Sequence, residues 1–229
     1  MITLSIVVPA LGEAAGIGRS LALLAPLRAR GCEVILVDGG SHDGTLLVAA
    51  PLADRVLVAI RGRASQMNAG ASVARGEVLL FLHADSEPPP DADRLIAEGL
   101  ARSGRVWGRF DARLSGAHPL LRIVERAMNW RSRVTGICTG DQGIFVRRDV
   151  FERIGGYPPI ALMEDIALSR ELRRTNPPLC LTAPILTSSR RWERNGVLRT
   201  VLAMWRLRLM YFLGADPARL ARDYEQQLV

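Results

Sequence analysis

Polar residues that could bind a metal ion or a nucleotide follow two apolar runs of the sequence. Asp38 ends the run that begins at Glu33, and His83 and Asp85 follow the run 77–82. Magnesium and manganese ions are held by carboxylate oxygens together with phosphate oxygens of a substrate. Asp85 is therefore the better candidate for a metal ligand, whereas His83 could bind the metal, support a ligand or pack. Asp38 could accept hydrogen bonds from a ribose or from the N–H of a base.

Two arginines, Arg61 and Arg63, stand on either side of Gly62, where a helix is expected to begin. Guanidinium groups match the oxygens of phosphates, and the amino end of a helix favours anions. The turn could therefore hold a diphosphate. A charged helix start at the protein surface explains the same residues equally well.

A third candidate group is the pair of adjacent acids Glu164 and Asp165 at the start of another expected helix. Acids in the first turn of a helix often only complement its dipole. Two adjacent carboxylates can also raise the pKa of one of them, which then serves as a general base. The sequence leaves both interpretations open. Glu13, directly after the first apolar run, is by itself explained by a turn.

These residues need a scaffold, and the sequence predicts an α/β fold with a mostly parallel central sheet flanked by helices. Continuous apolar runs, typical of strands buried on both faces, occupy 4–8, 33–37, 55–60 and 77–82. Helical patterns occupy 17–30, 45–50, 64–74, 91–102, 120–134 and 164–174, and further strands are expected at 106–114 and 143–146. Ligands of such sheets bind beyond the carboxyl ends of the strands, where these polar residues lie.

The composition limits the functions open to the 229 residues. Hydrophobic residues make up 48%, which excludes a disordered chain, and all 30 basic residues are arginine, which excludes a catalytic or phosphate-binding lysine. The net charge of +7 suits nucleic acid, anionic lipid or phosphorylated substrates equally. Three separated cysteines predict neither disulfides nor a zinc site, and the first apolar run is too short for a signal peptide. A cytoplasmic protein is expected.

The order of these groups along the chain resembles the family 2 glycosyltransferases, which have the GT-A fold. The family's segment after the first strand is matched at Pro9 and Glu13, with Gly12 in place of the usual Asn. Its Val-Asp-Asp-Gly-Ser-x-Asp-Gly-Thr motif appears as residues 37–45, with Gly39 in place of the second Asp.

Later segments extend the resemblance to about residue 195. His-Ala-Asp at 83–85 stands where the family has its Asp-x-Asp metal motif, with only the second acid kept. Glu-Asp at 164–165 corresponds to the family's base motif, 140–143 to a segment on the acceptor side, and 189–192 to a basic-aromatic motif near the diphosphate. The particular variants also resemble a small bacterial subfamily named for neighbouring radical-SAM and selenium-related genes, a name that indicates no substrate.

The resemblance implies a hexosyl-type, inverting glycosyltransferase. It would move a sugar from a nucleoside-diphosphate sugar, expected to be UDP-linked, to a hydroxyl acceptor, with Mg²⁺ or Mn²⁺ as cofactor. A single Rossmann-like GT-A domain over 1–229 is expected, with a nucleotide-sugar half at 1–104, an acceptor half at 105–195 and C-terminal helices at 196–229.

The same resemblance implies roles for individual residues. Asp165 is the implied base, with Glu164 orienting a neighbour, and Asp85 is the implied metal ligand, with His83 as a further candidate. The implied donor-binding residues are Pro9, Glu13, Asp38, Arg61, Arg63, Gln66, Asn68, Ala84 and Arg191. Those implied on the acceptor side are Gly140, Asp141 and Gln142.

Other functions can be built on a fold of this kind. A Rossmann-type oxidoreductase would bind a nicotinamide nucleotide, but Gly12, Gly16 and Gly18 do not have the spacing of the dinucleotide fingerprint. A sugar-nucleotide pyrophosphorylase usually has a catalytic lysine, and this chain contains none. Nucleic acid is not an expected partner, because acids recur at strand ends and aromatic residues make up only 5%.

The segment 197–213 is apolar over most of its circumference, although Arg206 and Arg208 lie near its middle. It is shorter than the roughly 20 apolar residues that span a bilayer. It could be a helix packed on the domain, or an interfacial helix with Trp205 and Tyr211 at the level of lipid headgroups. In the second case the basic segment 120–134 would join it, the enzyme would lie peripherally on the inner face of the membrane, and the acceptor would be lipid-linked.

Overall fold

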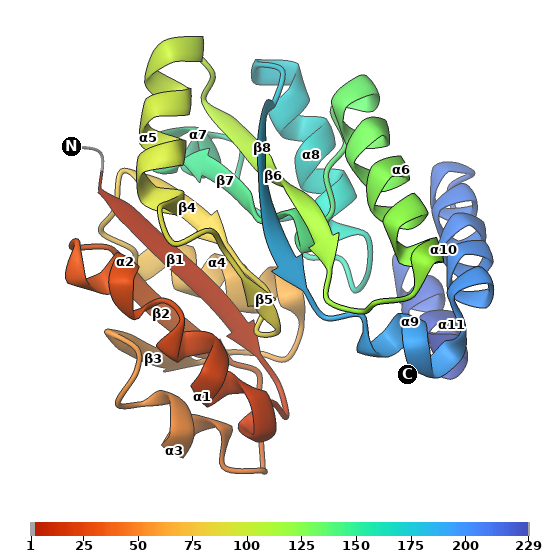
Figure 1. Ribbon diagram of the computed structural model, residues 1–229, viewed down its shortest axis with the longest axis horizontal. Helices are drawn as coiled ribbons and strands as arrows, with labels where there is room; N and C mark the ends of the chain where they lie inside the picture. Colours follow the sequence, from red (N-terminus) through yellow and green to blue (C-terminus); the bar gives the residue numbers. More distant parts are fainter. Residues whose placement is uncertain (1–2, 229) are drawn as a thin grey trace.

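A sheet of eight strands forms the centre of the molecule, and helices cover both of its faces (Figure 1). The structure is a computed structural model that describes residues 3–228. The strands lie in the order β3-β2-β1-β4-β7-β6-β8-β5. Their bounds are β1 Leu4–Ala10, β2 Glu33–Asp38, β3 Arg55–Val58, β4 Val78–Phe81, β5 Ser86–Glu87, β6 Trp107–Leu114, β7 Ile144–Arg147 and β8 Leu179–Thr187. Because β7 pairs antiparallel with β4, one sheet runs through both expected halves of the chain.

Two helical layers bury the two faces of this sheet. The helices are α1 Ala14–Ala22, α2 Ala25–Ala29, α3 Thr45–Ala49, α4 Arg63–Val73, α5 Ala92–Ser103, α6 Pro119–Thr135, α7 Arg148–Arg153, α8 Glu164–Thr175, α9 Arg190–Asn195, α10 Val197–Phe212 and α11 Pro217–Leu228, with a 3₁₀ turn η1 at Gly140–Gln142. Ile6 and Val8 of β1 pack with α1, α2 and α5, whereas Val7 packs with α4, α7 and α8. Successive side chains of a strand point to opposite faces, so the continuous apolar runs correctly predict strands buried on both sides.

The prediction of one helix over 17–30 is wrong. The chain forms α1, which ends at Ala22, and the separate helix α2, which begins at Ala25. Pro26 lies in the first turn of α2, where its missing N–H is not needed. Inside a longer helix its ring would clash with the carbonyl of Ala22, so the helix breaks before it.

The expected strand 55–60 is shorter and less buried than predicted. It ends at Val58, which is 68% exposed, and Ile60 beyond it is 82% exposed. β3 is the outermost strand and has a neighbour on one side only. An apolar run at the edge of a sheet has the same sequence pattern as one at its centre, so the pattern could not distinguish the two.

The sequence does not predict β8, although β8 is the longest strand of the sheet. It pairs parallel with β6, and its register shifts where Phe110 and Asp111 face Leu181 and Pro184. A proline argues against a strand because it lacks the N–H of the ladder. The register shift accommodates Pro184 within β8.

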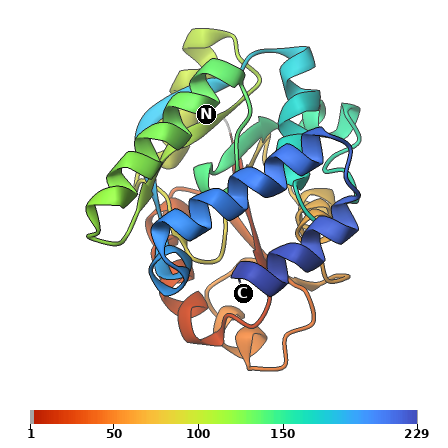
Figure 2. The ribbon, with the colours of Figure 1, turned by 90° about the vertical axis from the view of Figure 1, so that its right-hand side faces the viewer.

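The C-terminal helices α10 and α11 lie beside each other, and α10 also runs along α6 (Figure 2). Leu207 of α10 and Tyr224 of α11 are buried together with Ile137, which follows α6, and with Met163 and Ile166 at the start of α8. Among residues 3–228, no helix combines the length and the apolar character that crossing a membrane requires.

Candidate active site

Glu13 and Asp85 lie beside each other at the carboxyl edge of the sheet. Burial raises the pKa of Glu13 above its ordinary value, and the negative charge of Asp85 raises it further. The positive charges of Arg190 and Arg63 act in the opposite direction. The site therefore concentrates negative charge on two strand ends that are 72 positions apart in the chain, between arginines from α9 and α4.

Asp85 is a half-buried carboxylate that makes no hydrogen bond or ion pair with another group of residues 3–228. In the same described part of the chain, no three His, Cys, Asp or Glu side chains converge into a complete metal cage. A site that shares its ion with substrate phosphates needs only one or two carboxylates from the protein. The residues present fit an ion of that kind, with Asp85 as its protein ligand.

His83 and Asp141 form a pair that joins the end of β4 to η1. His83 Nδ1 lies 3.4 Å from Asp141 Oδ1, and a Cβ atom on Gly140 would overlap the opposite side of the imidazole ring at Nε2. Both ring nitrogens thus face η1. Burial raises the pKa of Asp141, but His83, Arg63 and Arg191 outweigh burial and lower it to about 2.

The adjacent acids Glu164 and Asp165 begin α8 after Met163, whose φ of 68° is the only left-handed one among the non-glycine residues described. Asp165 Oδ2 accepts a hydrogen bond from the N–H of Gly140 at 2.9 Å, and Oδ1 accepts one from Ile166 at 2.7 Å. Glu164 is only 4% exposed. Burial, followed by the charge of Asp165, raises the pKa of Glu164 to about 6. One acid of the pair is thus fixed in orientation, and the other holds its proton more strongly than usual.

Arg63 and Arg191 meet at Tyr224, which comes from the last helix. The surrounding protein disfavours the charge of Arg63, but Glu164, Tyr224 and nearby acids outweigh this effect and raise its pKa. Arg191 places its guanidinium carbon 5.1 Å from the centre of the Tyr224 ring. Arg61 instead points toward Glu225, at 3.8 Å, and 71% of its side chain is exposed.

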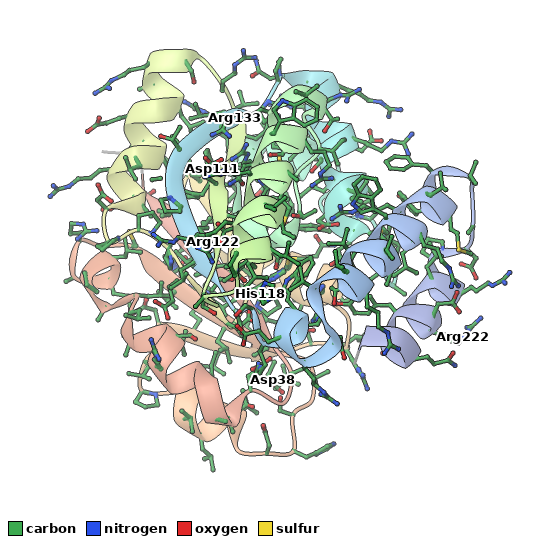
Figure 3. All side chains as sticks on the ribbon, turned by 45° about the vertical axis from the view of Figure 1, so that its right-hand side comes forward. Asp38, Asp111, His118, Arg122, Arg133 and Arg222 are labelled. Carbon is green, nitrogen blue, oxygen red and sulfur yellow. The ribbon has the colours of Figure 1, made fainter. Side chains whose placement is uncertain are left out.

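Several of the residues expected to bind the donor or the acceptor are engaged by the protein itself. Gln66 donates to the carbonyls of Ala10 and Val37, and Asn68 exchanges two hydrogen bonds with the backbone of Tyr157. The carboxylate of Asp38 accepts from Gly40 and Ser41, and its place at the edge of the sheet is marked in Figure 3. Gln142 is fully buried against Asn129 and Ser132. These side chains fix the loops that line the site.

Pro9 and Ala84 contribute shape to the same edge. Pro9 is buried in β1 opposite Val37, beyond the point at which β1 stops pairing with β4, so its missing N–H leaves no gap in the sheet. Ala84 is 8% exposed between His83 and Asp85.

Four residues of this region are not predicted as site residues from the sequence. They are Arg131, Arg190, Arg208 and Tyr224. Of these four, only Arg190 could have been predicted from the sequence, because it belongs to the basic-aromatic segment 189–192. The others reach the site through the packing of α6, α10 and α11, which no local pattern reports.

A hollow of about 560 Å³ lies at the opposite, amino edge of the strands, between residues such as Arg28, Asp54 and Arg75. Arg28 already forms a 2.6 Å ion pair with Asp54 there. Ligands of open α/β sheets bind at the carboxyl edge. The candidate active site is therefore the carboxyl edge with its acids, and not this hollow.

Comparison with known sequences shows the family of the chain. The family model described as Glycosyl transferase family 2 matches residues 5–155, which is more than half of the chain. A PGL/p-HBAD biosynthesis glycosyltransferase of Mycobacterium bovis (strain BCG / Pasteur 1173P2) is 34% identical over 170 residues, covering 67% of this chain and 62% of that protein. An undecaprenyl-phosphate 4-deoxy-4-formamido-L-arabinose transferase of Pseudomonas fluorescens (strain Pf0-1) is 31% identical over 127 residues, covering 50% and 36%. The chain thus spans less than two thirds of the length of these relatives.

Among solved structures, the fold is similar to that of glucosyl-3-phosphoglycerate synthase from Mycobacterium tuberculosis, crystallised with Mn²⁺ and UDP-glucose. The TM-score is 0.60 at 19% identity, covering 81% of this chain and 70% of that one. A likeness at this identity shows the fold alone, which is GT-A. The family match over 5–155, which is more than half of the chain, shows that the chain belongs to glycosyl transferase family 2.

Proposed function

We propose that the enzyme transfers a sugar from a UDP-sugar to an acceptor hydroxyl with inversion at C1. The observation that carries the proposal is the position of Arg63 between two acid groups. Its charge acts on Glu13, beside Asp85, and on Glu164 in the acid pair of α8. A diphosphate bound by Arg63 would lie between an acid that can hold a metal and an acid that can act as a base.

The donor diphosphate is assigned to Arg63 and Arg191, which Tyr224 holds together. Arg61 is too exposed, and too close to Glu225, to share this role on equal terms. Asp38, Gln66 and Asn68 support the donor by fixing the loops around it.

Asp165 is assigned as the catalytic base. Backbone N–H groups of Gly140 and Ile166 orient its carboxylate, which takes the proton of the acceptor hydroxyl. The hydroxyl oxygen forms a bond to C1 of the sugar while the bond from C1 to the diphosphate oxygen breaks. Attack opposite the leaving group inverts the configuration, and the proton remains on Asp165. Glu164, buried behind it, orients the pair.

A divalent cation, Mg²⁺ or Mn²⁺, would neutralise the charge that grows on the departing diphosphate. Asp85 is the residue that would hold it, because its carboxylate is not engaged within residues 3–228. His83 is assigned to positioning Asp141, since both of its ring nitrogens face η1. Mn²⁺ and UDP-glucose in the structure of glucosyl-3-phosphoglycerate synthase support this choice of cofactor and donor.

A membrane surface is the second part of the proposal. The helices α6 and α10 are neighbours (Figure 2). On both helices, apolar side chains that are 56–69% exposed recur at helical spacing. They are Ile123, Trp130, Val134, Leu198, Leu202, Trp205, Leu209 and Phe212, and we call them the apolar stripe. Basic proteins with such a face bind anionic bilayers from the side. The acceptor is then lipid-linked, as the undecaprenyl phosphate in the name of one relative suggests.

The residues that form this apolar surface differ from those expected from the segments 197–213 and 120–134. Tyr211 packs against α11 and is only partly accessible, so Trp130 and Trp205 replace the expected pair of aromatic anchors. Two arginines of α6 form ion pairs, Arg122 with Glu125 and Arg133 with Asp111. Arg126 and Arg133 are exposed and leave α6 with a basic surface.

Calorimetric titration with UDP- and GDP-sugars, with and without Mn²⁺, tests the proposed reaction. We expect one nucleotide sugar to bind more tightly with Mn²⁺. Asp165→Asn should then lower turnover on the order of a hundredfold or more while donor affinity changes less than about twofold. Donor affinity lost in parallel with turnover would contradict Asp165 as the base. If the protein bound NADH and no nucleotide sugar, the proposed sugar transfer would be wrong, and a Rossmann-type oxidoreductase would take its place.

A further inference from the structure

Two arginines on neighbouring helices approach the candidate base without a protein partner of their own. Arg131 lies on α6 and Arg208 on α10. The buried nitrogens Nε and Nη2 of Arg131, and Nε of Arg208, have no hydrogen-bond partner within residues 3–228. Buried polar groups are almost always paired, because leaving them without a partner costs free energy. Two such groups side by side indicate a binding position for a ligand.

The neighbouring arginines of α6 show that pairing is possible in this part of the fold. Arg133 lies 2.7 Å from Asp111, and both residues are labelled in Figure 3. Arg122 lies 3.0 Å from Glu125. The carboxylates of Asp111 and Glu125 are therefore already paired with other arginines. Arg131 instead lies inward, among the groups around Asp165.

The charges around the two guanidinium groups do not balance. Burial lowers the pKa of Arg131 to about 10, and the positive charge of Arg208 adds to this effect. Burial likewise lowers the pKa of Arg208. The charge of Asp165 acts favourably on both guanidinium groups, and that of Asp141 on Arg208. The oxygens of Asp165 already accept hydrogen bonds from Gly140 and Ile166, and Asp141 pairs with His83.

We propose that Arg131 and Arg208 bind a phosphate group carried by the acceptor. Two guanidinium groups present paired donors that match the oxygens of a phosphate, and a doubly charged anion would neutralise both positive charges. The assignment to the acceptor rests on the proposed function, because both arginines surround Asp165, the proposed base. The phosphate could belong to a lipid, reached from the apolar stripe on the outer sides of the same two helices, or to a small soluble molecule.

The test fills the donor site first, so that a phosphate probe cannot bind there. Wild-type protein saturated with UDP and Mn²⁺ is titrated calorimetrically with inorganic phosphate, glycerol 3-phosphate and farnesyl phosphate. We expect binding of at least one probe, weakened about tenfold or more in Arg131→Gln and in Arg208→Gln. Arg126→Gln and Arg206→Gln are matched controls, because both arginines are exposed on the same two helices, and should change affinity less than about twofold. UDP affinity should be unchanged in all four variants.

Thermal unfolding gives a second readout that does not depend on turnover. Because the two charges repel each other and lack partners, Arg208→Gln should not lower the Tm of the ligand-free protein. Phosphate should raise the Tm of wild type and leave that of Arg208→Gln unchanged. A Tm that falls by about 4 °C or more without ligand would show a structural role and overturn the proposal.

The remaining outcomes separate this inference from the proposed function. If UDP–Mn²⁺ binds but no phosphate probe does, or if both glutamine variants bind phosphate like wild type, the phosphate site is overturned alone. If UDP affinity falls with phosphate affinity, the arginines belong to the donor site. A wild-type protein that binds no UDP contradicts the proposed function. The effect of the two glutamine variants on phosphate affinity still decides whether Arg131 and Arg208 form a phosphate site. Preference for farnesyl phosphate supports a lipid phosphate, and preference for glycerol 3-phosphate a soluble one.

Discussion

Asp85 is a half-buried carboxylate that makes no hydrogen bond or ion pair within residues 3–228. Because no contact of the fold depends on this side chain, Asp85→Ala should not harm the fold. Loss of the metal ligand should raise the barrier to transfer by several kcal/mol and abolish both transfer and donor hydrolysis. Turnover with Mn²⁺ and with EDTA measures this, and Asp91→Ala, an exposed acid at α5, is the control. Full activity of Asp85→Ala, or of wild type in EDTA, would refute the metal assignment.

Glu164 makes the stability of the protein depend on pH. Its pKa is raised to about 6, so the buried carboxyl favours the folded state most while it is protonated, below its unfolded pKa near 4.5. This contribution is lost as the pH rises through about 6. Glu164→Gln keeps the neutral form, and should therefore be more stable than wild type by on the order of 1–2 kcal/mol at pH 8 and about equal at pH 4.

Thermal unfolding of wild type and Glu164→Gln across this pH range measures the effect. Glu152→Gln is the control, because Glu152 is exposed on α7. A constant difference between Glu164→Gln and wild type at every pH would mean that the carboxyl does not titrate in the folded protein.

At the scale of elements, η1 connects the two acid groups of the site. Its residue Gly140 donates to Asp165 and touches the ring of His83, and the next residue, Asp141, pairs with that ring. A side chain on Gly140 would overlap the imidazole. The position of η1 therefore couples β4 to α8.

Gly140→Ala should push His83 out of place and lower turnover about tenfold or more, with donor affinity less affected. Removing the ring should relieve the overlap. The double variant Gly140→Ala/His83→Ala should therefore lose less activity than the two single losses combined. If the loss of activity in the double variant equals the product of the two single losses, His83 and Gly140 act independently. Ala59→Gly, a substitution of similar size outside the site, is the control.

At the scale of the whole molecule, the apolar stripe predicts binding to anionic vesicles. Cosedimentation should increase with the content of anionic lipid and decrease with salt, because arginine-rich faces attract anionic headgroups. Replacing Trp130 and Trp205 by Ser should weaken binding about tenfold or more, through lost apolar contact. Leu47→Ser is the matched control, since Leu47 is 83% exposed on α3 but lies outside the stripe. No binding at low salt would exclude the membrane surface.

The sequence by itself determined the parallel half of the sheet and the acids at its edge. The runs that form β1, β2 and β4 are continuous and apolar, and this signal lies within a few neighbouring residues. Because a strand carries the residue after it to the edge of the sheet, Asp38 and Asp85 could be placed without any tertiary contact. Membership of the radical-SAM and selenium-associated subfamily, and the division of the chain at 104 and 195, stay predictions.

Only the tertiary structure brought Arg131 and Arg208 to the candidate site. They look like other arginines in a chain that has 30 basic residues, all of them Arg. Their proposed role depends on a distant residue, Asp165 from α8, just as the interaction of Arg63 depends on Tyr224 from α11. The same holds for β8, whose proline is tolerated only because its register against β6 shifts. Such contacts join residues that are far apart in sequence, so no local spacing could reveal them.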